Sequence, residues 1–162
     1  MIYQTINKMD SKEYSKKFRI ENIGNHQTDT NLRELINVLE QLTDVNVDDI
    51  KQLRIHINNI NNNKNINMFV VKYEDKIIGS GTVLIEDKII HNFGKVAHIE
   101  DVVIDSKFRG NGLAKKLINK LISVSKKHNC YKIILNASDN VKAFYEKLGF
   151  IHHTNSMRID LL

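Results

Sequence analysis

A glycine-rich turn over residues 109–114 has the residue types best suited to chemistry in this sequence. Its residues are Arg109, Gly110, Asn111, Gly112, Leu113 and Ala114. The turn lies between a predicted strand and a predicted helix, so unpaired backbone N–H groups and the positive end of the helix dipole meet there. Together these features suit an anion such as phosphate. A plain glycine turn remains the alternative, because the spacing fits neither a Walker motif nor a complete GxGxxG dinucleotide motif.

Two adjacent acids, Glu100 and Asp101, interrupt an otherwise apolar predicted strand over residues 96–104. Neighbouring residues of a strand face opposite sides of the sheet, so we expect at least one acid to be buried unless it serves a ligand. An ion pair with a lysine or a cap on nearby backbone is the alternative interpretation.

Length and composition indicate an ordinary folded protein. The 162 residues are expected to form a single domain, residues 1–162, since about 150 residues per domain is usual. The formal net charge of +5 suits an anionic small molecule at least as well as a nucleic acid. A basic nucleic-acid-binding module stays as a remote alternative, because the lysine-rich residues 115–127 lack interleaved aromatic residues. We therefore expect no nucleic-acid partner.

The single cysteine, Cys130, bears on the compartment and on metal binding. One cysteine allows no internal disulfide and no cysteine-rich zinc site, so we expect a cytoplasmic protein without a bound metal. No apolar run approaches the roughly 20 residues that span a bilayer, and residues 1–10 lack the apolar stretch of a signal peptide. Neither membrane insertion nor secretion is expected.

The elements that must position these residues follow from hydrophobic periodicity. Strands are predicted over residues 17–23, 68–73, 77–85, 96–104, 131–135 and 154–162, and residues 89–93 are left open as a further strand. Helices are predicted from Asp29 or Thr30 to Leu42, over residues 47–60 and 110–128, and from Asp139 or Asn140 to Leu148. This order predicts an α/β (α+β) fold, with a mixed sheet flanked by about four helices. Crossovers through the two late helices would join parallel strands.

Two motifs carry a resemblance to a known family. Residues 109–114 resemble the Arg/Gln-x-x-Gly-x-Gly/Ala loop of the GNAT superfamily of acetyl-CoA-dependent N-acetyltransferases. Residues 143–150, Ala-Phe-Tyr-Glu-Lys-Leu-Gly-Phe, resemble its tyrosine-containing helix and Gly-Phe ending. Residues 84–91, 98–103 and 125–133 resemble the branch that acetylates glucosamine 6-phosphate. The resemblance implies the GNAT fold, splayed where acetyl-CoA binds; acetylation of another small amine or of a protein N-terminus is the alternative.

The resemblance also implies an acetyl-CoA site and one catalytic residue. Its residues would be Val102, Val103, Ile104, Arg109, Gly110, Asn111, Gly112, Leu113, Ala114, Asn136, Ala137, Ser138 and Tyr145. Tyr145 would be the acid, because a phenol of pKa about 10 can protonate a departing thiolate whose conjugate acid has a pKa of about 8.5. Without the resemblance, Tyr145 would be interpreted as a packing residue of its helix.

The acceptor site is likewise implied by the resemblance, together with a homodimer. Its residues would be Thr43, Lys88, Ile89, Ile90, His91, Glu100, Asp101, Val102, Tyr131, Lys132, Asn136 and Arg158. Tyr131 and Lys132 would reach the sugar phosphate from the partner subunit. The family has an acid where this chain has Asn136, which accepts a hydrogen bond but cannot remove a proton. It has an arginine where this chain has Asp160, so Arg158 becomes the candidate replacement.

Overall fold

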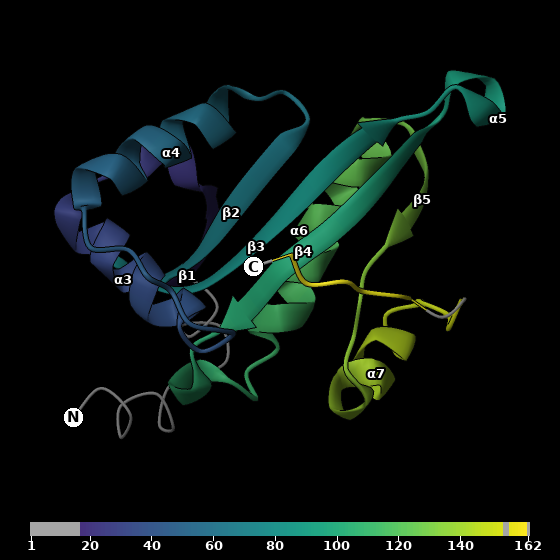
Figure 1. Cartoon of the computed structure of the whole chain (residues 1–162). Helices are drawn as coiled ribbons and strands as arrows, with labels where there is room; N and C mark the ends of the chain where they lie inside the picture. Colours follow the sequence, from purple (N-terminus) through teal and green to yellow (C-terminus); the bar gives the residue numbers. More distant parts are fainter. Residues whose placement is uncertain (1–16, 154–155, 162) are drawn as a thin grey trace.

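A five-stranded sheet forms the centre of the computed structural model, which describes residues 17–153 and 156–161 (Figure 1). The strands are β1 (Phe18–Asn22), β2 (Ile66–Tyr73), β3 (Lys76–Asp87), β4 (Lys95–Ile104) and β5 (Cys130–Ile134), and they lie side by side in this order. Each of the first four pairs antiparallel with its neighbour, whereas β5 runs parallel to β4. The predicted mixed sheet is confirmed.

The helices cover both faces of this sheet (Figure 1). They are α3 (Asp29–Leu39), α4 (Ile50–Asn62), α5 (Ile90–Phe93), α6 (Leu113–Lys127) and α7 (Asp139–Glu146), with 3-10 turns η1 (Ile23–Asn25) and η2 (Ser106–Phe108). Helices α3 and α4 pack on one face and α6 on the other. The four longer helices within the described residues match the predicted number. The single turn of α5 occupies most of residues 89–93, so a further strand there is excluded.

Local sequence explains where the first two helices begin. The N-cap of α3 is Thr28, whose hydroxyl accepts a hydrogen bond from the Asn31 N–H at 3.2 Å, so the predicted cap at Asp29 or Thr30 is wrong by one or two residues. The cap of α4 is Asp49, whose carboxylate accepts the Lys51 N–H at 2.7 Å. Helix α3 ends at Leu39, which leaves Leu42 of the predicted apolar stripe 46 % exposed.

Two apolar clusters hold the helices against the sheet. The cluster under α6 includes the fully buried residues Ile78, Val83, Ala97, Leu117, Ile118 and Leu121. The cluster under α3 and α4 includes Ile23, Leu32, Leu35, Ile57, Val70 and Ile77. Gly81 allows α6 to approach β3 closely, because a Cβ there would lie 3.1 Å from the Leu117 side chain. Both faces of the central strands are therefore buried, which fixes their register.

The sheet opens between β4 and β5. Their pairing runs only from Lys95 opposite Cys130 to His98 opposite Ile134. Beyond His98, no strand of the described chain pairs with β4 on that side, although β3 continues to pair with it on the other. Backbone groups along the second half of β4 are thus left for a ligand or water. This opening confirms the predicted splay of the sheet.

The predicted last strand is wrong over the residues that the structure describes. Residues 156–161 contain no strand, and residues 154, 155 and 162 lie outside the described residues. Met157, Ile159 and Leu161 alternate as in a strand, yet they are 98 %, 82 % and 86 % exposed. Alternation indicates which face of a strand would be apolar, but a strand also needs an edge to pair with. The expected second parallel crossover is accordingly absent from the described chain.

Candidate functional site

A β-bulge in β4 sets the orientation of the two predicted acids, Glu100 and Asp101. The register places Ser80 opposite Val103 and Thr82 opposite Glu100, so one residue of β3 faces two residues of β4. Asp101 lies in the bulge with a φ of 53°. Sequence reasoning assumed regular alternation, but the bulge leaves Asp101 exposed and Glu100 half-buried. Left-handed backbone at a residue other than glycine is strained, and such strain is concentrated at functional sites.

A charged network surrounds Glu100 on β4. Burial raises the pKa of the Glu100 carboxyl, the neighbouring Asp101 carboxylate raises it further, and His98 acts in the opposite direction. His98 in turn lies with Nε2 2.9 Å from the Glu86 carboxylate, which also pairs with Lys88. Hydrogen bonds from Lys88 and then His98 lower the pKa of Glu86. The sequence analysis missed Glu86 as a partner, since the antiparallel pairing of β3 with β4 brings it to His98.

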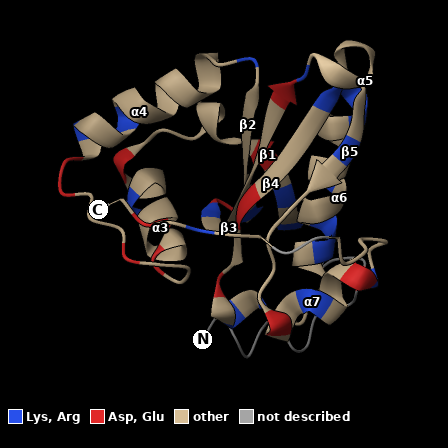
Figure 2. Ribbon diagram, turned by 45° about the vertical axis from the view of Figure 1, so that its right-hand side comes forward, with Lys and Arg blue, Asp and Glu red and all other residues tan. Residues whose placement is uncertain are grey.

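The glycine-rich turn forms an open cradle at the start of α6. Gly110 and Gly112 have φ values of 81° and 71°, and apart from their immediate chain neighbours no described residue lies within 4 Å of where their Cβ atoms would stand. No side chain caps the helix at Gly112, so the amide groups of its first turn face this open space. The predicted anion site therefore has the space and the donors for a phosphate group, and lysines continue along α6 (Figure 2).

Hydrogen bonds tie this turn to the end of β4. The Arg109 side chain donates through Nε to the Ile104 carbonyl at 2.9 Å. The Asn111 amide donates to the Phe108 carbonyl at 3.0 Å and to the Arg109 carbonyl at 3.2 Å. Val103 and Ile104 are buried and Val102 is partly buried. The end of β4 that leads into the turn is therefore anchored in the apolar core. The open edge of β4 and the glycine-rich turn therefore follow each other closely along the chain.

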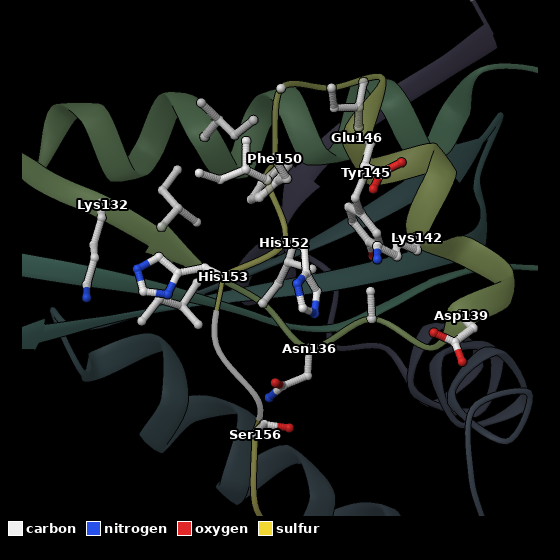
Figure 3. A pocket seen from close by; sticks show the side chains of 18 residues that line it. Lys132, Asn136, Asp139, Lys142, Tyr145, Glu146, Phe150, His152, His153 and Ser156 are labelled. Atoms are coloured by element: carbon white, nitrogen blue, oxygen red, sulfur yellow. The ribbon is translucent and has the colours of Figure 1, made fainter.

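Tyr145 lines a cleft of about 1070 Å³ between β5, α7 and the segment that follows Phe150 (Figure 3). Its ring lies edge-on to those of Phe144 and Phe150, at centroid distances of 5.1 and 5.8 Å. Burial raises the pKa of the Tyr145 phenol. The hydroxyl therefore stays protonated at neutral pH, as an acid catalyst requires.

Several predicted residues share this cleft and others do not. Asn136, Ala137 and Lys132 line it with Tyr145, whereas Ser138 lies beyond it as the N-cap of α7. His152, His153 and Lys142 also line the cleft (Figure 3), and the sequence analysis missed all three. The sequence signal for the two histidines was Gly149-Phe150 after α7, because a glycine with positive φ turns the chain there and brings residues 152 and 153 to the cleft.

A second group of predicted residues gathers at the opposite end of β4. Lys88, Ile89, Ile90 and His91 form the tip between β3 and β4, where the His91 ring lies 4.4 Å from that of Tyr131. Consecutive residues His91, Asn92 and Phe93 all have positive φ. Lys132 pairs with Val96, and the six residues from there to Val102 span roughly 20 Å at the usual rise of a strand. One subunit therefore does not bring this tip to Val102.

The remaining predicted residues lie apart from the cleft. Thr43 is exposed just after α3, where its N–H donates to the Leu39 carbonyl at 3.4 Å. Arg158 is exposed and pairs with Asp160 at 2.6 Å. No cluster of three metal-ligating side chains occurs within residues 17–153 and 156–161. In the same residues, no helix has the length and apolar composition needed to cross a bilayer.

Comparison with known proteins identifies a family and several relatives. The model of the acetyltransferase (GNAT) family matches residues 32–150. The chain is 46 % identical over 86 residues to a glucosamine 6-phosphate N-acetyltransferase of Trypanosoma brucei brucei, covering 53 % of this chain and 58 % of that relative. It is 48 % identical over 82 residues to the enzyme of that name from Arabidopsis thaliana, covering 51 % and 55 %. The chain thus spans little more than half the length of these two relatives.

A solved structure extends the similarity over most of the chain. The crystal structure of glucosamine-6-phosphate N-acetyltransferase from Arabidopsis thaliana superposes with a TM-score of 0.80 at 32 % sequence identity. The superposition covers 89 % of this chain and 98 % of that one. The open sheet, the cradle and the helix of Tyr145 therefore lie within a shared fold.

Substitution of Glu100 tests the electrostatics of the site. A carboxyl whose pKa is raised by folding stabilises the fold below its unfolded pKa of about 4.3, and this contribution is lost as the pH rises through the folded pKa. Glu100→Gln should therefore unfold at higher denaturant concentration than the wild type at pH 7, with the difference shrinking below pH 4. Urea denaturation across this pH range measures it.

Glu86→Gln is the matched control, because the pKa of Glu86 is lowered. Its loss should destabilise the protein at neutral pH and matter less in acid, which is the opposite sign. If Glu100→Gln were the less stable protein at every pH, the ionised Glu100 would be a stabilising group and this interpretation would be wrong.

Proposed function

Because the chain belongs to the acetyltransferase (GNAT) family, we propose that it transfers the acetyl group of acetyl-CoA to the amine of glucosamine 6-phosphate. The observation that carries the proposal is the cradle at residues 109–114 placed at the end of the open edge of β4. An elongated cosubstrate with a pyrophosphate needs both, since backbone amides bind the phosphates and a strand edge binds an extended chain. The names of the relatives in trypanosome and plant support the acceptor.

Tyr145 would protonate the leaving group. The amine nitrogen attacks the thioester carbonyl carbon, the carbon–sulfur bond breaks, and the phenol supplies the proton that the thiolate takes up. A raised phenol pKa keeps that proton on Tyr145 before the reaction. Solvent then returns a proton to the tyrosine, and the nitrogen, which carries an extra proton after its attack, releases that proton to water to give the neutral amide. Exposed backbone near Val102 would polarise the thioester carbonyl.

The acids of β4 would receive the amino sugar. Glu100 and Asp101 lie next to the open edge, and hydroxyls or the amine of a sugar would satisfy carboxylates that no ion pair of the described chain engages. The amine must lose a proton before it attacks. Asn136 can orient it but cannot accept that proton, so water is the proposed acceptor.

We further propose a homodimer with shared sites. Lys132 pairs with Val96, roughly 20 Å along β4 from Val102, and the tip at residues 88–91 precedes the start of β4, so the tip is better placed to serve a partner's site. Exposed apolar side chains support a contact, since Ile89 and Phe93 at the tip are 87 % and 77 % exposed. The same conclusion is supported by β5, whose outer edge pairs with no described strand, and by the exposed residues 156–161.

A cytoplasmic location is part of the proposal. Cys130 is partly buried and its burial raises the pKa of the thiol, which is typical of an unreactive cysteine. A lone cysteine of this kind is compatible with a reducing compartment.

Release of CoA across a panel of acceptors tests the function. Glucosamine 6-phosphate, glucosamine and several peptides would be compared in the same assay. We expect kcat/KM for glucosamine 6-phosphate to exceed that for glucosamine by at least about tenfold, since a hydrogen bond to a charged group contributes about 1.5–3 kcal/mol. Preference for a peptide would instead indicate a protein acetyltransferase of the same family.

Gly112→Val tests the cradle. Valine is strained at a φ of 71° and its side chain would fill the space for phosphate. Acetyl-CoA at 100 times its Kd should stabilise the wild type by about 2.7 kcal/mol, and the variant should lose this shift in thermal denaturation. Asn129→Val is the control, because Asn129 has a φ of 57° at the other end of α6. That variant should be destabilised but keep the shift.

Tyr145→Phe tests the proposed acid. The hydroxyl is needed when charge develops on sulfur, so kcat should fall by about 100-fold while both KM values change little. Steady-state kinetics with saturating concentrations of each substrate in turn would separate these effects. Unchanged kcat would make Tyr145 a packing residue between Phe144 and Phe150.

Subunit mixing tests the shared site. Lys132 lines the cleft of its own subunit, so the geometry alone does not determine which site it serves. Lys132→Ala and Tyr145→Phe should each be nearly inactive toward glucosamine 6-phosphate, and their heterodimers should regain activity, because one site then has both residues intact. Heterodimers purified with two affinity tags and still inactive would show that each subunit completes its own site.

A further inference from the structure

A second cavity, separate from the cleft of Tyr145, lies at the end of the sheet where β2 turns into β3. Its volume is about 690 Å³, within the usual range for small-molecule sites. The first turn of α3 forms one wall, the β2–β3 turn another and η2 a third. Nothing in the proposed acetyl transfer uses this cavity.

A buried lysine is the unusual feature of this cavity. Lys72 on β2 is only 5 % exposed and lines the cavity on the side of α3. No ion pair or hydrogen bond connects its ammonium group to the described residues. The buried polar side-chain atoms without a partner in the described residues belong to His26, Asn67 and Ser80, so the Lys72 ammonium itself opens onto the cavity while its stem is buried. Lys72 is therefore a cation without an anionic partner among the described residues.

The carboxylates around the cavity already have other partners. Glu34 accepts the Ile77 N–H at 3.0 Å. Glu74 pairs with Lys17 at 3.1 Å, and Asp75 with Arg19 at 3.3 Å. Both of these acids lie at the rim, where their side chains are 59 % and 98 % exposed. None of the three neutralises Lys72 directly.

Further positive charge faces the same space. Lys76 and Lys107 line the cavity, from the β2–β3 turn and from η2. Thr30 and Asn31 line it from the first turn of the 11-residue helix α3, where the helix dipole is positive. Asp29 in this turn is paired with Arg54 rather than with a lysine of the cavity. The helix terminus and the Lys72 ammonium thus favour the same kind of ligand.

We propose that this cavity is a second anion site, which binds a small phosphate-bearing molecule between Lys72, Lys107 and the first turn of α3. The Lys72 ammonium supplies the charge and is fixed in place by burial of its stem. The Thr30 amide in the first turn of α3 supplies a directed hydrogen bond, whereas the Asn31 N–H is already capped by Thr28. Inorganic phosphate and a phosphate monoester share the required chemistry, and their relative affinities distinguish a free ion from a phosphorylated metabolite.

Lysine-selective NMR of the wild-type protein gives the direct test. The Lys72 signal, assigned by its absence from Lys72→Met, would be followed during titration with inorganic phosphate and, separately, glycerol 2-phosphate. Saturating CoA keeps both from residues 109–114, and constant ionic strength removes screening effects. We expect a saturable shift of the Lys72 signal. A signal that does not move up to about 50 mM phosphate would overturn the proposal, since weaker binding has no specificity.

Thermal denaturation of Lys72→Met adds a second readout. At ten times its Kd, phosphate should raise the Tm of the wild type by about 3 °C and leave the variant nearly unchanged. Without phosphate, the variant should be about as stable as the wild type, because methionine keeps the buried stem and removes an ammonium group that no described residue pairs with. Lys64→Met, at an exposed lysine, is the control and should keep the full shift. An equal shift in Lys72→Met would refute the site.

Discussion

The early end of pairing between β4 and β5 is the constraint on which the proposed site depends. A buried strand must satisfy its backbone hydrogen-bonding groups, and β4 does so along β3 but only as far as His98 along β5. The rest of that edge is available to an extended ligand. Because β4 leads directly into the cradle and β5 into the helix of Tyr145, this one divergence places the proposed phosphate donors, the open strand edge and the proposed acid at the same end of the sheet (Figure 1).

Groups that disfavour folding lie both in the proposed site and in the turn between β3 and β4. Asp101 has left-handed backbone, and both burial and the neighbouring Asp101 carboxylate raise the pKa of Glu100, which opposes its ionisation. Three successive residues at the tip, from His91 to Phe93, share the left-handed conformation. The two apolar clusters around β2 and β3 provide the stability that allows such strain, which is how binding sites are commonly built.

Local elements were predictable because their signals are local. The apolar stripe of α6 and the hairpin of β2 and β3 follow periodicity, and both formed as expected. The cradle was predictable for a similar reason, since two glycines before an amphipathic helix specify a turn with free amides. Residues 156–161 show the limit of this reasoning. Their alternation is that of a strand, but pairing depends on a neighbour that lies outside the segment.

The sequence by itself determined the longer helices, the strands other than that last one, the open glycine turn before α6 and, through resemblance, the role expected of Tyr145. Only the tertiary structure decided where β5 leaves β4, that a bulge turns Asp101 outward, and that Glu86 meets His98. It alone separated the tip at residues 88–91 from Val102 and buried the stem of Lys72 with no partner for its ammonium among the described residues. Periodicity and capping act between residues a few positions apart, whereas register, bulges and charge burial arise from contacts between segments distant in the chain.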